Sequence, residues 1–197
     1  MMKRAIILMM ALVFIGGLIV SPALAGDDSK ALRAKEKEVW KDWCSKIPPE
    51  RQLDVDQFKA LYDKVMAGEE KAYLIDTRTH PEFYAGHIPG TNHIHSGHMY
   101  TIPKKIKDKN AKIVVWCRTH KRQCYVGGFL AMYGYTNVWL YKEGIVGWIK
   151  KGYPLCNQFM GKFKVVEYHK YFSGKYKKGP NAGKEKDPFM IREFHPF

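Results

Sequence analysis

Acidic residues are scarce in this chain of 197 residues. Asp and Glu together number 19 against 33 Lys and Arg, which gives a formal net charge of +14 at pH 7. A basic protein of this kind is suited to meet anionic lipid, an acidic partner protein or a small anion. No nucleic-acid recognition motif accompanies the charge, and we therefore expect no nucleic-acid partner.

Long apolar runs are absent beyond the N-terminus. The one run there, residues 5–20, spans roughly 16 residues, whereas a membrane-spanning helix needs about 20. A basic stretch precedes it, Ser-Pro ends it, and residues 23–25 (Ala-Leu-Ala) supply the small residues of a signal peptidase site. This layout predicts a secretory signal peptide over residues 1–25, and hence a periplasmic or secreted protein. An uncleaved membrane anchor is the alternative.

Cysteine is also rare. Its four positions, Cys44, Cys117, Cys124 and Cys156, are too few for a disulfide scaffold in a chain of this length. An oxidising compartment permits a Cys44–Cys156 disulfide, which would join an N-terminal helix to the C-terminal extension. We expect Cys124 to be a small buried residue, and the alternative is a resolving thiol for Cys117.

Helical and extended patterns alternate along the chain. Helices are expected at residues 27–47, 56–68, 122–133 and 145–150, and strands at residues 72–75, 92–95, 112–116 and 137–140. The clearest strand, residues 112–116, is a bulky apolar run typical of the interior of a parallel sheet. The alternation predicts an α/β layered fold with a mostly parallel sheet. Beyond Pro154 no period is sustained, which indicates an extension and not a second domain.

Cys117 directly follows this clearest strand. The residues after it, up to the next helix, are Arg118, Thr119, His120, Lys121 and Arg122. A loop between a parallel strand and a helix N-terminus directs several backbone N–H groups at one point, and three cations add positive potential there. Both effects favour the thiolate, so we expect a lowered pKa and a nucleophilic sulfur. The alternative is a structural cysteine, although nearby cations make an apolar site costly.

Two segments carry a resemblance to the rhodanese homology domain family. Residues 74–90 (LIDTRTHPEFYAGHIPG) are similar to its Asp-x-Arg, Glu-Phe and Gly-His-Ile-Pro-Gly signature, and residues 115–122 (VWCRTHKR) to its strand, cysteine and six-residue active loop ending in Arg. The resemblance covers about residues 55–154. It implies a three-layer, rhodanese-like α/β domain, with residues 26–54 a helical N-terminal extension and residues 155–197 a basic, aromatic C-terminal extension.

The resemblance implies a sulfurtransferase that takes sulfane sulfur from thiosulfate or a persulfide donor. Cys117 would carry the sulfur as a persulfide, without a cofactor, and pass it to a thiophilic acceptor. Arg118, Lys121 and Arg122 would attract and orient the anionic donor, and Thr119 and His120 would line the loop. The expected supporting residues are Asp76, Arg78, Glu82 and His87. The alternative is a relay module that serves a partner protein without turnover.

His120 departs from the family, whose loops commonly have glycine at this fourth position. Histidine would be strained there if the backbone φ were positive. His120 could bind an anion or carry a proton, or it could face solvent without a role. The loop also has four residues between Cys117 and Arg122, whereas cysteine phosphatases of similar architecture have five, and we therefore disfavour phosphatase activity.

Two further features invite a functional interpretation. His93, His95 and His98 could bind zinc or copper, but no cysteine or carboxylate lies alongside, so we predict no metal. Residues 162–186 interleave lysines with aromatic residues, which could dock to an acidic protein or an anionic membrane surface. A tail whose aromatic residues cover the domain is the interpretation we prefer.

Overall fold

The computed structural model describes residues 25–165. The predicted signal peptide and most of the predicted docking segment at residues 162–186 lie outside the described residues. The chain divides into two compact units, Met1–Val39 and Trp40–Phe197. Helix α2 (Ala25–Ser45) begins in the first unit, where residues 30–39 are all exposed. Among residues 25–165, no helix has the length and hydropathy to cross a membrane.

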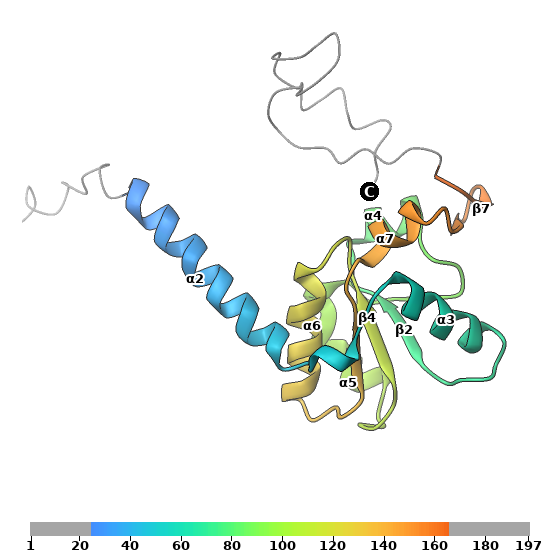
Figure 1. Cartoon of the computed structure of the whole chain (residues 1–197), viewed down its shortest axis with the longest axis horizontal. Coiled ribbons are helices and arrows are strands. Elements are labelled where there is room, and N and C mark those ends of the chain that lie inside the picture. Colours follow the sequence, from blue (N-terminus) through green and yellow to red (C-terminus); the bar gives the residue numbers. More distant parts are fainter. Residues whose placement is uncertain (1–24, 166–197) are drawn as a thin grey trace, which may run out of the picture. The chain divides into compact units, whose positions relative to one another are not determined.

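A five-stranded sheet forms the centre of the second unit (Figure 1). Its strands are β1 (Gln52–Leu53), β2 (Tyr73–Asp76), β3 (Asn92–His93), β4 (Ile113–Trp116) and β5 (Val138–Tyr141). They lie in the order β1-β5-β4-β2-β3, and every pairing between them is parallel. The predicted α/β fold with a parallel sheet is therefore confirmed. Strand β4 is central and wholly buried, as its unbroken apolar sequence predicts.

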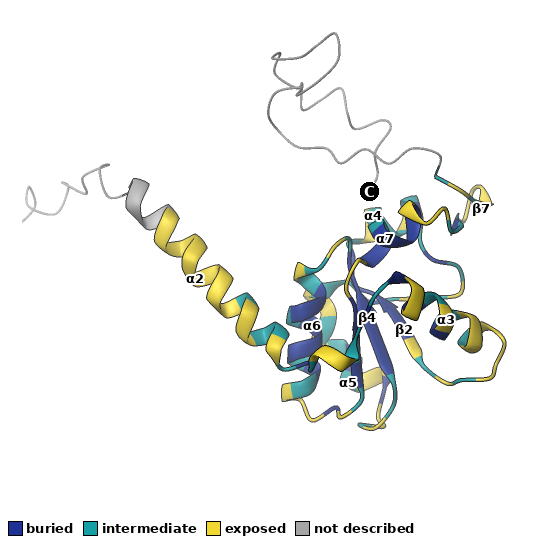
Figure 2. Ribbon diagram, in the orientation of Figure 1, coloured by how far each residue is buried: buried dark blue, intermediate teal, exposed yellow. Residues whose placement is uncertain are grey.

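Helices cover both faces of the sheet. They are α3 (Val55–Met66), α4 (His80–Ala85), α5 (Ile102–Lys105), α6 (Lys121–Met132) and α7 (Gly144–Lys150), with 3-10 turns at Pro49–Arg51 and Ser96–Thr101. Because successive side chains of a strand point to opposite faces, Val115 packs with residues of α5 and α6, and Trp116 packs with residues of α3 and α7. Figure 2 shows the buried residues gathered in the strands and along the helices that cover them.

The folded unit begins and ends beyond the predicted boundaries of residues 55–154. Strand β1 pairs with β5, although both of its residues were predicted to belong to the N-terminal extension. At the other end, β6 (Leu155–Asn157) and β7 (Gly161–Phe163) form an antiparallel hairpin, and Leu155 is wholly buried. Strands of two or three residues are too short to show a period in the sequence, which is why these additions were missed.

Candidate active site

The candidate active-site loop, residues 117–122, begins where the central strand β4 ends. Cys117 is 1% exposed. Its backbone N–H donates to Gln123 Oε1 at 2.9 Å, and its carbonyl oxygen accepts from the backbone N–H of Ile145 at 3.1 Å, in the first turn of α7. The loop is therefore fixed by contacts with two helices as well as by the strand that precedes it.

Gly144 lies where the backbone of α7 approaches the loop most closely. Its φ is +57°, and a Cβ atom on it would lie 2.3 Å from the carbonyl oxygen of Cys117. Both the backbone conformation and the lack of space require glycine. A larger residue here would push the active-site loop out of position.

The Cys117 thiol lies inside a ring of hydrogen-bond donors. Burial raises the pKa of this thiol. Two weaker effects lower it: the charge of Arg122, and hydrogen bonds from the backbone N–H groups of Gln123, Thr119 and Arg122. The expected ring of N–H groups is present, but the expected lowering of the pKa is wrong. The sequence shows the cations near Cys117 but not how deeply its sulfur is buried, and here burial has the larger effect.

Arg122 is paired with Glu82 of α4. Its guanidinium donates to both carboxylate oxygens, at 2.6 and 2.8 Å, and it also hydrogen bonds with Cys117. Burial would raise the pKa of Glu82, but hydrogen bonds from Arg122 and Thr79 outweigh burial and hold that pKa at about 2. The charged carboxylate therefore fixes Arg122 beside the sulfur at neutral pH.

Asp76 and Arg78 form an ion pair that is completely buried. The Arg78 guanidinium donates to both carboxylate oxygens of Asp76 and to the backbone carbonyl groups of Glu82 and Gly86, at distances of 2.7 to 3.0 Å. These contacts join the end of β2 to both ends of the short helix α4. The pair thus positions Glu82, and through Glu82 it positions Arg122.

Replacing Asp76 by Asn should destabilise the fold strongly. The change leaves the buried Arg78 guanidinium without its counter-charge, which costs about 3 to 5 kcal/mol of unfolding free energy. Urea denaturation followed by circular dichroism measures this loss. Asp63→Asn is the matched control, because its partner Lys59 lies on the surface of α3 and the loss should stay below about 1 kcal/mol. Equal losses in the two variants would contradict this account.

His87 connects α4 to the hairpin that follows the domain. Its Nδ1 hydrogen bonds with the Phe83 carbonyl at 3.0 Å, and its Nε2 lies 3.3 Å from Cys156 Sγ. The backbones of His87 and Cys156 are also joined by two hydrogen bonds. His87 therefore lies among structural contacts of α4 and β6.

The remaining loop residues differ in exposure. Thr119 and Lys121 are exposed, and Arg118 is half-buried. His120 has a φ of −135°, so histidine brings no backbone strain at the position where the family commonly has glycine. Its ring packs edge-on against Trp40, with 5.7 Å between ring centroids. The alternative of a solvent-facing His120 is therefore wrong, because the side chain is partly buried and packs on Trp40.

A disulfide joins Cys44 of α2 to Cys124 of α6, and Cys117 and Cys156 are free. The Cys44–Cys156 disulfide that the sequence permitted is therefore not formed, and Cys124 is not a free resolving thiol. The expectation that Cys124 is buried is confirmed. The last turn of α2 packs on α6 because Gly128 has no side chain: a Cβ atom there would lie 2.7 Å from the Trp43 carbonyl oxygen. The Gly-Gly pair inside α6 was the one sequence signal that could have indicated this contact.

Gln123 also belongs to the candidate site, although nothing in the sequence predicted it. It is completely buried. Its Oε1 accepts from the Cys117 backbone N–H at 2.9 Å, and its Nε2 donates to the Tyr141 carbonyl at 2.7 Å. Gln123 thus connects the loop to β5. No pattern in the sequence separates it from an ordinary polar residue in the first turn of a helix.

Four histidines surround a cavity of about 370 Å³ beside β3. The distances from the ring centroid of His80 to the ring centroids of His93, His95 and His98 are 4.8, 5.8 and 6.0 Å. His93 Nε2 hydrogen bonds with the Arg78 carbonyl at 2.8 Å, which gives this histidine a structural contact. The structure thus brings the three predicted histidines together with a fourth, and the prediction that they bind no metal stays a prediction.

Comparison with known proteins agrees with this geometry. Residues 55–151 match the family model described as "Rhodanese-like domain". A protein named sulfurtransferase, from Allochromatium vinosum, is 29% identical over 92 residues, which are 46% of this chain and 83% of that protein.

Two solved structures are similar to this chain. A protein of unknown function from Rhodopseudomonas palustris, titled a possible tyrosine phosphatase, has a TM-score of 0.53 at 20% identity, over 61% of this chain and 92% of that one. This likeness shows a shared fold. A rhodanese-related protein from Thermoplasma volcanium has a TM-score of 0.44 at 25% identity, over 53% and 96% of the two chains. With the sheet, the loop and the family match taken together, residues 55–151 of this chain form a rhodanese-like domain.

Proposed function

We propose that this protein is a sulfurtransferase that moves sulfane sulfur from thiosulfate or a persulfide donor to a thiophilic acceptor, through a persulfide on Cys117. The observation that carries the proposal is the ring of backbone N–H groups around the Cys117 sulfur, with the Arg122 guanidinium beside it. No cofactor is required in this scheme, because the cysteine itself carries the sulfur.

The first half-reaction loads the enzyme. The Cys117 thiol loses its proton to solvent, and the thiolate attacks the outer sulfur of thiosulfate. A bond forms between the two sulfur atoms, the sulfur–sulfur bond of thiosulfate breaks, and sulfite leaves with the electron pair. The negative charge of the persulfide then lies within reach of the loop N–H groups, which stabilise it as they would stabilise an oxyanion.

The second half-reaction unloads the enzyme. An acceptor such as cyanide, a thiol or a protein cysteine attacks the outer sulfur of the persulfide. The bond to Cys117 breaks, and the cysteine leaves as a thiolate in the same ring of donors. The same groups thus stabilise the charge on sulfur in both half-reactions.

The loop cations have different roles in this scheme. Lys121 is exposed and Arg118 is half-buried, so their charges act on a dianionic donor as it approaches from solvent. Arg122 already binds Glu82 with both nitrogens of its fork. Arg122 therefore stabilises the sulfur directly, while Arg118 and Lys121 contribute to the attraction of the donor.

The basic charge and the N-terminal segment support two further parts of the proposal. A secretory signal peptide at residues 1–25 would place the protein in the periplasm or outside the cell. There the basic, aromatic segment after residue 155 would meet an acidic protein partner or an anionic membrane surface. Neither part is needed for the chemistry at Cys117.

Steady-state turnover separates an enzyme from a relay module. With thiosulfate and cyanide as the two substrates, we expect thiocyanate to form at a rate on the order of 1 s⁻¹ or faster. A relay module would instead gain one sulfur from a persulfide donor, seen as a mass increase of the intact protein, without turnover on free thiosulfate. A protein that does neither is not a sulfurtransferase.

A further inference from the structure

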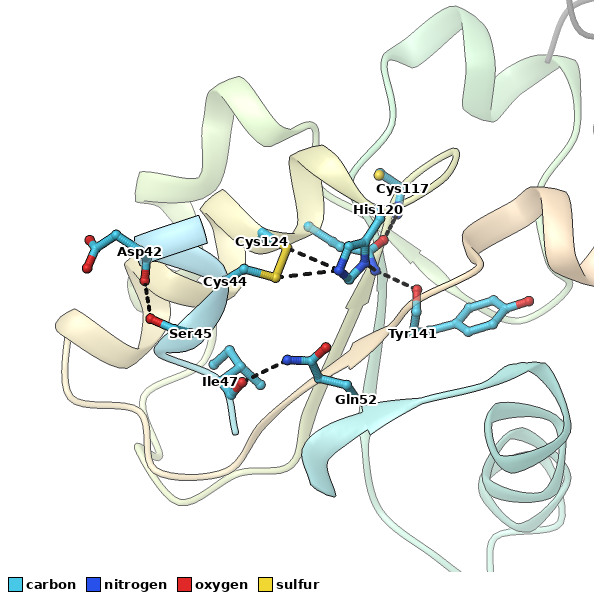
Figure 3. The surroundings of a disulfide bond; sticks show 10 residues. Asp42, Cys44, Ser45, Ile47, Gln52, Cys117, His120, Cys124 and Tyr141 are labelled. Carbon is cyan, nitrogen blue, oxygen red and sulfur yellow. Dashed lines mark hydrogen bonds between the residues drawn. A yellow bond between two sulfur atoms is a disulfide. The ribbon is translucent and has the colours of Figure 1, made fainter. Parts of the chain in front are cut away.

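The imidazole ring of His120 points toward the Cys44–Cys124 disulfide, which lies next to the candidate active site. Figure 3 shows the imidazole lying beside the two sulfur atoms of Cys44 and Cys124. Its Nε2 is 3.5 Å from Cys44 Sγ and 3.6 Å from Cys124 Sγ. A residue of the sulfur-carrying loop thus contacts a second sulfur centre, formed by cysteines 80 positions apart in the sequence.

The hydrogen bonds of Gln123 indicate which ring nitrogen of His120 carries the hydrogen. A backbone N–H can only donate, so the Gln123 atom facing the Cys117 N–H must be the oxygen. The amide nitrogen of Gln123 then faces His120 Nδ1, 3.1 Å away, and donates to it. The hydrogen of the neutral imidazole therefore lies on Nε2, the nitrogen beside both sulfurs.

The N–H group of His120 stabilises the reduced form of the Cys44–Cys124 pair more than it stabilises the disulfide. Disulfide sulfur is a weak acceptor, whereas a thiolate is a strong one. Burial and the positive charge of Lys142 lower the pKa of His120, and they outweigh a hydrogen bond to the Lys142 carbonyl, so the ring is neutral. A carbonyl can only accept, so the single N–H of the neutral ring is shared between this carbonyl and the two sulfurs. A donor that stabilises a thiolate makes the corresponding disulfide easier to reduce.

We propose that Cys44 and Cys124 form a redox-active pair in the folded protein, and that their oxidation state controls the active-site loop through His120. The pair would exchange with a dithiol, either a small molecule or a partner protein. The first claim is independent of the proposed function, and the second rests on it.

The exchange proceeds in two steps. A thiolate of the dithiol attacks Cys44 Sγ, because Cys44 is half-buried and Cys124 is completely buried. Cys124 leaves as a thiolate and accepts the hydrogen bond from His120 Nε2. The second thiol of the dithiol then attacks the mixed disulfide and releases Cys44. The dithiol is oxidised to a disulfide and the cysteine pair is reduced. Cys44 takes up one proton through solvent, Cys124 stays a thiolate that accepts the hydrogen bond from His120 Nε2, and the second proton of the dithiol passes to solvent.

A continuous chain of contacts joins this pair to Cys117. The sulfurs contact His120 Nε2, His120 Nδ1 accepts from Gln123, and Gln123 Oε1 binds the backbone N–H of Cys117. Reduction removes the covalent link that holds the last turn of α2 against α6. The support of His120, and with it the position of Gln123, then changes next to the loop that cradles the sulfur.

Cys44, His120 and Cys124 also form a possible metal site. Within residues 25–165 they are the one group whose ligand atoms all lie close enough together to hold a metal ion. A metal bound to His120 Nε2 would place the ring hydrogen on Nδ1, directly facing the donating amide of Gln123. Two donors would then oppose each other. The hydrogen-bond network therefore favours a thiol pair over a metal site.

Equilibration in dithiothreitol buffers tests the redox claim. Free thiols are alkylated and the peptides of Cys44 and Cys124 are counted by mass spectrometry, with His120→Phe as the matched variant that keeps a ring but lacks the N–H. We expect the folded wild-type pair to be reduced, and the equilibrium constant for reduction to be about tenfold lower in His120→Phe. Reduction only after unfolding in urea, equal constants in both proteins, or free thiols with a stoichiometric metal ion would each overturn the claim.

Turnover of variants without the disulfide tests the link to the active site. In the absence of reductant, Cys44→Ser/Cys124→Ser should form thiocyanate at least about fivefold more slowly than the wild type. If the double variant does not fold, the single variant Cys44→Ser is used in the same assay. Folded variants with wild-type turnover would overturn the link. A wild type without turnover and without sulfur uptake would instead reject the proposed function, and the alkylation result would stand.

Discussion

Replacing Cys117 by Ser is expected to lower thiocyanate formation by at least about three orders of magnitude. A serine hydroxyl cannot carry sulfane sulfur, so both half-reactions lose their intermediate. Cys156→Ser is the matched control, because Cys156 is the other free cysteine of the described residues and lies beside His87, in the structural contact of β6 with α4. Turnover should stay near the wild-type value in this control.

The control also shows which of the two free cysteines carries the sulfur. If Cys117→Ser kept substantial turnover while Cys156→Ser lost it, the sulfur carrier would be the cysteine of the hairpin. Circular dichroism spectra of both variants should match the wild type, since serine is close in size to cysteine and leaves the Cys117 N–H bond to Gln123 in place.

The rate of sulfur loading should rise steeply with pH. Burial raises the pKa of Cys117 above its ordinary value, so only a small fraction of the thiol is ionised at neutral pH. Below its pKa the thiolate fraction increases tenfold for each pH unit. We therefore expect the single-turnover rate of loading from thiosulfate to increase about 100-fold between pH 6.5 and pH 8.5.

A pre-steady-state measurement without acceptor isolates this step. Sulfite release is followed at a series of pH values, and iodoacetamide alkylation of Cys117 in Cys156→Ser gives an independent profile of the same ionisation. A rate that is already constant above pH 7 would mean that the N–H ring and Arg122 outweigh burial. That outcome would restore the lowered pKa that the sequence predicts and contradict the interpretation of the structure.

The sequence was sufficient for the fold and for the position of Cys117 at the end of the central strand. Strand β4 is an unbroken apolar run, and the cysteine after it, with a helix beginning four residues later, marks the carboxyl end of a parallel strand. Such signals lie within a few consecutive residues, and they can be recognised without knowledge of the tertiary structure. The same holds for the Asp-x-Arg segment, whose two charged residues meet as neighbours in the buried pair.

The features that the sequence could not predict depend on distant parts of the chain. Arg122 and Glu82 are 40 positions apart, and Cys44 and Cys124 are 80 apart, so their pairing follows from the packing of helices and not from local patterns. The direction of the Cys117 pKa depends on its burial, which only the folded structure reveals. For the same reason the role of His120 could not be chosen from its position in the loop.

The most direct test of the central claim is to locate the sulfur. The protein is exposed to thiosulfate labelled in its outer sulfur, digested under non-reducing conditions, and the peptides are examined by mass spectrometry. We predict one additional labelled sulfur atom on the peptide that contains Cys117, and its loss after addition of cyanide. Labelled sulfur on the Cys156 peptide alone, or no labelled peptide at any pH between 6.5 and 8.5, would contradict the account.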